Sequence, residues 1–131
     1  MNHSLKETKP TRGWREKFEA AFRGAKRGVR GHSSFFVHFF FTALVIACSV
    51  ALNIALWEWC ALILCIGGVL VSELFNSSIE TLVRGMPLDQ RPPYWPALDI
   101  AAGAVLVASG FACAIGILIL APKFLTFWVT R

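Results

Sequence analysis

Three long runs of apolar residues dominate the chain, and short polar segments separate them. They cover roughly residues 34–56, 59–83 and 98–121, and each is long enough to cross about 30 Å of hydrocarbon as a helix. We therefore predict an all-α membrane protein with three transmembrane helices. A long polar and basic segment precedes the first run, unlike the start of a signal peptide, so we expect that run to stay in the mature protein.

The segment before the first span has the spacing of an amphipathic helix rather than a continuous apolar run. Apolar residues recur there every three to four positions: Trp14, Phe18, Phe22, Ala25 and Val29. Lysines and arginines occupy the other faces, which predicts an amphipathic helix over 14–31 on the cytoplasmic membrane surface, either alone or also packed on the spans. Residues 1–13 show no period and are expected to be a mobile polar tail, which leaves 14–131 as a single integral membrane domain.

Composition and charge agree with this class. Of the 131 residues 56% are hydrophobic, which is too apolar for a small soluble domain. The net charge of +5 gathers before Ser33 and in the second loop, so the positive-inside rule places both in the cytoplasm, as expected for an inner-membrane protein. Anionic lipid explains the same charges more simply than nucleic acid does.

Several residues in and around the spans have simpler interpretations. The four cysteines form no Cys-x-x-Cys pair and are expected to pack rather than bind metal. Glu58, between two tryptophans, is interpreted as a solvated turn residue, and Asp99 is expected in the first turn of the third span. Alanines and glycines stud that span, which indicates close helix packing within or between subunits.

The second span carries a polar stripe. Glu73, Asn76 and Glu80 fall within a sector about 60° wide on a helix. A charge in the membrane costs roughly 2.5 to 3.5 kcal/mol, so an intramembrane carboxylate normally faces a protein interior or a wet cavity. In an antiparallel hairpin Asp99 begins the third span at the level where Glu80 ends the second. We therefore predict a site at this depth.

The residue types in this site suit phosphoryl transfer. Carboxylate and amide oxygens are the hard ligands that Mg²⁺ prefers, and the metal neutralises the phosphates of ATP. A further carboxylate orients or deprotonates the attacking hydroxyl. No Gly-x-x-x-x-Gly-Lys loop is present, so the nucleotide site is expected to be unconventional.

Two other interpretations of the stripe stay open. Glu80 and Arg84 have the spacing of an ion pair on an emerging helix, and Asn76 has the chemistry of an interhelical contact. An ion or proton pathway is the other possibility, but it predicts acidic residues at all depths, whereas these cluster in the cytoplasmic half.

At these residues the chain resembles the small prokaryotic diacylglycerol kinase and undecaprenol kinase family. The resemblance covers about residues 18–122, through "FRGAKRGVRGHSSFFVH", "ELFNSSIETLV" and "LDIAAGAVLVAS". It implies a homotrimer with a surface helix and three transmembrane helices per chain, which uses Mg²⁺ and ATP to phosphorylate a membrane lipid hydroxyl at the cytoplasmic interface.

The resemblance also implies roles for individual positions. Glu73 would be the general base beside the substrate, and Glu80 would bind the metal and the nucleotide. Asn76, Asp99 and Gly103 would belong to the nucleotide site. His38 would lie at the substrate, where undecaprenol-type members often carry a histidine.

Three positions depart from the family pattern. His32 stands where the family usually has a metal-binding glutamate, and it would be a softer, uncharged ligand at that metal site. Leu98 stands where the family has a phosphate-contacting lysine, and Arg84 where an aspartate is common. Leucine supplies no cation, so other arginines are the candidates to compensate: Arg84, Arg91, Arg27 and Arg30. The alternative is a degenerate, non-catalytic homologue. The name of the family favours diacylglycerol over undecaprenol as the substrate.

Overall fold

The structure is a computed structural model that describes residues 13–31 and 33–129. Within these residues it contains four α-helices, with two short 3₁₀ turns between the last two: α1 (Trp14–Gly31), α2 (Ser34–Ala51), α3 (Leu56–Arg84), η1 (Leu88–Gln90), η2 (Pro92–Tyr94) and α4 (Trp95–Val129). α2, α3 and the segment that contains α4 are each long and apolar enough to cross a membrane. The prediction of an all-α membrane protein is confirmed.

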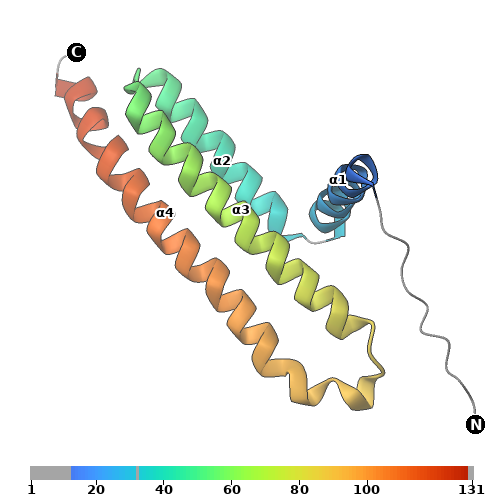
Figure 1. Cartoon of the computed structure of the whole chain (residues 1–131). Helices are drawn as coiled ribbons and strands as arrows, with labels where there is room; N and C mark the ends of the chain where they lie inside the picture. The colour runs from blue at the N-terminus through green and yellow to red at the C-terminus, as the bar shows by residue number, and fades with distance from the viewer. Residues whose placement is uncertain (1–12, 32, 130–131) are drawn as a thin grey trace, which may run out of the picture.

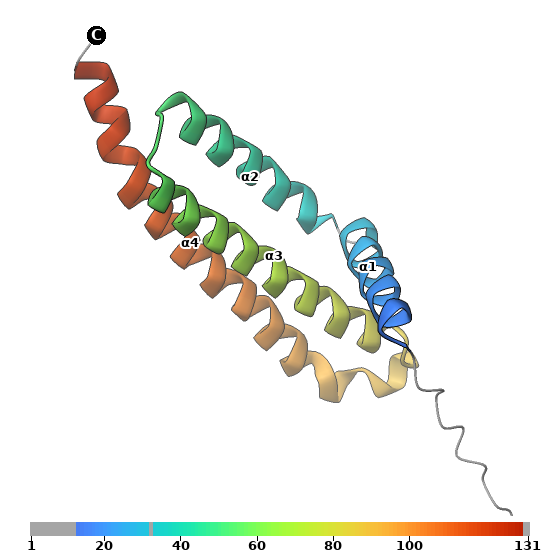
Figure 2. The ribbon, with the colours of Figure 1, turned by 45° about the horizontal axis from the view of Figure 1, so that its top comes forward.

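α3 and α4 form an antiparallel hairpin that makes the most extensive helix contact of the chain, and α2 lies beside α3 (Figure 1). α1 lies outside the group formed by α2, α3 and α4, and it contacts α3 near the start of α2 (Figure 2). Gly28 lies at this contact, because a Cβ there would meet Leu74 Cδ2 at 2.8 Å. Because Gly28 has no side chain, α1 can approach α3 closely at Leu74, the residue that follows Glu73.

The hairpin has two ends that we name for their connections. At the turn end, residues 52–55 join α2 to α3, and at the loop end, residues 85–94 join α3 to α4. Asn53 in the turn adopts a left-handed conformation with φ of 48°, which asparagine tolerates better than most side chains. Just beyond it, Ile54, Leu62 and Ile119 form the buried apolar cluster. The core of the chain therefore lies toward the turn end.

Most other large apolar side chains point outward, among them Phe36, Leu64, Phe75 and Leu106. Such a surface is expected where lipid is the solvent. The glycines of α4 serve no contact among residues 13–31 and 33–129, because a Cβ at Gly103, Gly110 or Gly116 would meet nothing within 4 Å there. Close packing between subunits stays a prediction for this face.

Several helix boundaries differ from those predicted, and α3 begins at Leu56 rather than at 59. The first span ends at Ala51 rather than near 56, because the chain turns at Asn53 although the residues around it remain apolar. α4 runs from Trp95 to Val129, beyond both predicted limits, and Pro122 does not end it. Its first turn contains no acidic residue, so Asp99 lies slightly farther inside the helix than expected.

The interpretation of Glu58 as a solvated residue was wrong. Glu58 is only 6% exposed. Its carboxylate accepts a hydrogen bond of 2.6 Å from the Ala55 N–H and lies 3.0 Å from Lys123 Nζ. The extra length of α4 explains the difference, because it carries Lys123 past the predicted end of the span and alongside the start of α3.

Candidate functional site

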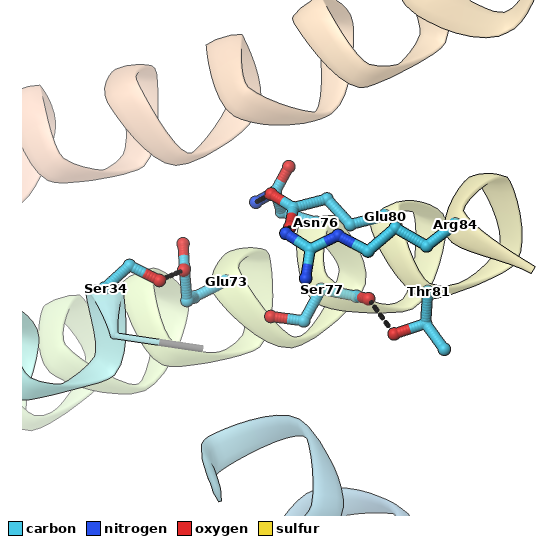
Figure 3. A network of polar contacts seen from close by, with 7 residues as sticks. All are labelled: Ser34, Glu73, Asn76, Ser77, Glu80, Thr81 and Arg84. Carbon is cyan, nitrogen blue, oxygen red and sulfur yellow. Dashed lines mark hydrogen bonds and ion pairs between the residues drawn. The ribbon is translucent and has the colours of Figure 1, made fainter. Parts of the chain in front are cut away.

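The predicted stripe lies along α3 and becomes more exposed toward the loop end. Glu73 is 3% exposed, Asn76 is 9% exposed, and the Glu80 side chain is 28% exposed. Figure 3 shows Asn76, Glu80 and Arg84 grouped on one side of α3, with Ser77 and Thr81 on another. A helical spacing of three and four residues produces this grouping. The acidic side chains therefore follow a path from the interior of the bundle to its surface.

Glu73 is held between α2 and α3. Ser34 Oγ donates a hydrogen bond to Glu73 Oε1 (Figure 3), and His38 Nε2 lies 3.7 Å from Glu73 Oε2. Ser34 and His38 are four residues apart on α2, so they share one helix face and reach the same carboxylate. A hydroxyl therefore lies within hydrogen-bonding reach of a buried carboxylate oxygen, which is one requirement for a general base.

Sequence reasoning missed Ser34. It precedes a run of apolar residues and has the character of an ordinary residue at a helix start. The available signal was its spacing from His38, a position that the family resemblance had already singled out. Pairing that face of α2 with the acidic stripe of α3 would have brought Ser34 to Glu73.

Glu80 uses both of its carboxylate oxygens. Asn76 Nδ2 donates to Oε1 at 3.1 Å, and Arg84 Nη2 donates to Oε2 at 2.9 Å. The ion pair that sequence analysis kept as an alternative therefore exists, and it lies inside the same polar cluster. Asn76 Oδ1 is buried and has no hydrogen-bond partner among the described residues. A buried amide oxygen of this kind is a ready acceptor for a ligand.

A pocket of about 360 Å³ opens at the loop end, which is within the range of small-molecule sites. Residues from α3, from the connection and from α4 line it: Glu80, Val83, Arg84, Arg91, Trp95, Leu98, Asp99 and Ala102. Glu80 and Asp99 thus meet at one pocket, as the hairpin geometry predicted. The pocket contains two carboxylates and two guanidinium groups.

Arg91 organises the connection at the edge of this pocket. Its Nε donates to the Met86 carbonyl oxygen at 3.0 Å, and its Nη2 donates to the Arg84 carbonyl oxygen at 2.8 Å. Backbone carbonyls at the end of a helix lack partners within the helix, so a guanidinium there is favourable. Arg91 consequently holds the end of α3 against the loop.

The donor set suits a magnesium ion that arrives with a nucleotide. Within 13–31 and 33–129 no cluster of three or more His, Cys, Asp and Glu side chains has the arrangement of a metal cage. Mg²⁺ commonly uses only one or two carboxylates and completes its shell with waters and phosphate oxygens. Glu80 and Asp99 at one pocket, with the unpartnered Asn76 Oδ1 nearby, fit that pattern.

The remaining predicted positions divide into three groups. Leu98 lines the pocket and presents an apolar side chain at the position where the family has a phosphate-contacting lysine. Gly103 is not among the residues that line the pocket, although its neighbour Ala102 is. Arg27 and Arg30 lie on α1 and do not line it either. His32 lies outside the described residues.

Comparison with known proteins covers nearly all of these elements. A family model described as prokaryotic diacylglycerol kinase matches residues 19–120. The undecaprenol kinase of Bacillus subtilis (strain 168) is 33% identical over 121 residues, which make up 89% of this chain and 98% of that protein. No solved structure matches the chain.

Proposed function

The chain belongs to the prokaryotic diacylglycerol kinase family of membrane lipid kinases, and from this premise we propose that it transfers the γ-phosphate of ATP to the hydroxyl of a membrane lipid. The observation that carries the proposal is the Glu73 carboxylate, which is 3% exposed and accepts a hydrogen bond from the Ser34 hydroxyl. The lipid hydroxyl takes the place of Ser34 at this oxygen.

Glu73 then acts as the general base. It accepts the proton of the lipid hydroxyl while the hydroxyl oxygen forms a bond to the γ-phosphorus. The bond between that phosphorus and the β–γ bridging oxygen breaks, and ADP leaves. Glu73 and Glu80 are about 10 Å apart along the helix, so the γ-phosphate points inward from the pocket at the loop end.

A magnesium ion bound with ATP would neutralise charge on the phosphate oxygens during transfer. Glu80, Asp99 and Asn76 are the residues that would hold it, because they combine carboxylate oxygens at one pocket with a buried amide oxygen that lacks a partner. The nucleotide would enter where α3 and α4 meet the loop.

The assembly and orientation follow from the same proposal. A homotrimer would cover the open face of α4, where the glycines meet no neighbour within the chain. The loop end and α1 would lie on the cytoplasmic side, because ATP is available there, α1 contains four arginines, and Arg84 and Arg91 flank the loop end.

Two lipids are candidates for the acceptor. The family description names diacylglycerol kinase, whereas the Bacillus relative is named undecaprenol kinase, so undecaprenol is as well supported as diacylglycerol. Both carry a primary hydroxyl on an apolar body. His38 beside Glu73 would contact the acceptor in either case.

The test is transfer of labelled γ-phosphate from ATP and Mg²⁺ to each lipid in mixed micelles. Glu73→Gln should reduce transfer at least about 100-fold, as expected for loss of a general base. Glu58→Gln is the matched control, because it changes a second buried glutamate of α3 at the turn end, and transfer per folded molecule should persist. Absence of transfer to both lipids by folded wild-type protein would favour a degenerate homologue.

A further inference from the structure

The pocket at the loop end needs positive charge to receive a nucleotide. Its lining already contains the carboxylates of Glu80 and Asp99, and a triphosphate brings more negative charge than one Mg²⁺ neutralises. Leu98 supplies none. Among the described residues the cations that line the pocket are Arg84 and Arg91, so we expect the binding of phosphate to depend on one or both of them.

These two arginines differ in how firmly they are held. Arg91 is half-buried and donates to two backbone carbonyl oxygens that fix the connection between α3 and α4. The Arg84 side chain is 65% exposed and forms its ion pair with Glu80 on the same helix. An exposed pair of this spacing contributes little to stability, so Arg84 is the cation that moves at little cost.

The partner of Arg84 is the residue that a nucleotide-bound metal requires. Both oxygens of Glu80 are engaged, one by Asn76 and the other by Arg84. If Glu80 held Mg²⁺ through its second oxygen, it would have to release the Arg84 guanidinium. The freed group is then beside the metal and its phosphates, and a guanidinium fork pairs well with phosphate oxygens.

We propose that Arg84 is the phosphate-binding residue of this pocket and that its ion pair with Glu80 exchanges when the nucleotide binds. Glu80 would release the guanidinium and hold Mg²⁺ through that oxygen, and Arg84 would pair with the β- and γ-phosphates. This inference rests on the proposed function, because it names the residue that contacts the nucleotide of that reaction. Arg91 keeps its place and holds the loop.

Equilibrium binding of a non-hydrolysable ATP analogue to the full chain in detergent micelles, measured by calorimetry without lipid, tests the proposal. With Mg²⁺ present, Arg84→Ala should weaken binding of the ATP analogue about 10- to 100-fold and leave AMP binding unchanged, since AMP lacks the β- and γ-phosphates. Arg30→Ala, an exposed arginine of α1 outside the pocket, is the matched control and should bind like the wild type.

Two further variants test the exchange itself. Without metal, Glu80→Gln should bind free ATP several-fold more tightly than wild type, because Arg84 is no longer paired, and the gain should vanish in Glu80→Gln with Arg84→Ala. Leu98→Lys should restore much of the binding that Arg84→Ala loses, because it places another cation in the same pocket. If the alanine variant does not fold, Arg84→Lys, which keeps the charge but lacks the guanidinium fork, replaces it in the same binding measurements.

The outcomes separate this inference from the proposed function. Wild-type binding and lipid transfer together with unchanged affinity in Arg84→Ala would overturn the inference alone. Equal losses for ATP and AMP would also overturn it, because they would indicate damage to the whole pocket. Wild-type protein that is folded but binds no nucleotide would overturn both.

Discussion

The two ends of the α3–α4 hairpin each contain a glutamate of α3 paired with a cation, but the pairs are built differently. At the turn end, Glu58 meets Lys123 of α4 at 3.0 Å, and the carboxylate is almost fully buried. At the loop end, Glu80 meets Arg84 of its own helix at 2.9 Å, and both side chains are partly exposed. One pair joins two helices, whereas the other joins two turns of one helix.

This difference separates stability from binding. A buried pair between helices resists opening, because breaking it leaves a charge without its partner in an apolar setting. The turn end also contains the buried cluster of Ile54, Leu62 and Ile119, which further stabilises the contact between α3 and α4 there. The pair at the loop end adds no contact between helices, and the pocket there stays open to ligands. The contact between α3 and α4 is therefore stabilised at the turn end, whereas the loop end has a pocket that is accessible to ligands.

The largest effect on this comparison is expected from Glu80→Gln at the loop end. Loss of the carboxylate should reduce phosphate transfer about 100-fold and raise the Mg²⁺ concentration needed for half-maximal rate, because a metal ligand is lost. The thermal midpoint should hardly change, since the pair with Arg84 contributes little. Transfer assays across a Mg²⁺ titration, with thermal unfolding in micelles, check this. A large fall in the midpoint would contradict the comparison.

The opposite result is expected from Lys123→Met at the turn end. It preserves most of the side-chain volume but leaves Glu58 without its cation, so the thermal midpoint should fall by several degrees. Transfer per folded molecule should stay within about 2-fold, far below the general-base effect of roughly 100-fold or more. Combining it with Glu58→Gln should recover part of the stability, because no unpaired charge remains. Greater loss in the double variant would refute the role assigned to the pair.

A smaller effect is expected from Ser34→Ala, which lies between the two ends. Its hydroxyl occupies the Glu73 oxygen that a lipid hydroxyl is proposed to use. Removing it should lower KM for the lipid a few-fold, because the lipid hydroxyl no longer has to displace it. The value of kcat should stay within about 3-fold, well below the roughly 100-fold expected for loss of the base. Initial rates over a lipid titration separate the two constants. A loss of kcat as large as that of Glu73→Gln would instead assign Ser34 a direct role in the chemistry.

Sequence patterns predicted those features that depend on helical period and hairpin direction. The spacing of Glu73, Asn76 and Glu80 put them on one stripe, and the antiparallel return of α4 brought Asp99 to the pocket that Glu80 lines. Neither inference needs the exact ends of a helix. Both therefore hold although α4 begins three residues earlier than expected.

Features that depend on helix ends and on contacts between faces were not predicted. Glu58 and Lys123 meet because α4 continues past Pro122, and no local pattern shows where an apolar helix stops in lipid. The turn at Asn53 was missed for a related reason, because apolar residues continue on both sides of it. Ser34 reaches Glu73 through the packing of α2 on α3, which periodicity within either helix does not determine.

The placement of charges along the hairpin also has a consequence for the thickness of the host bilayer. From Glu58 to Glu80 along α3, and from Asp99 to Lys123 along α4, the helices rise about 33 and 36 Å. A hydrocarbon layer of about 30 Å lies between these limits, with the ion pair at one boundary and the pocket at the other. In a much thicker layer one of them would be drawn below the headgroups, at a cost of fractions of a kcal/mol per Å. We therefore expect the chain to suit membranes whose acyl chains are of ordinary length.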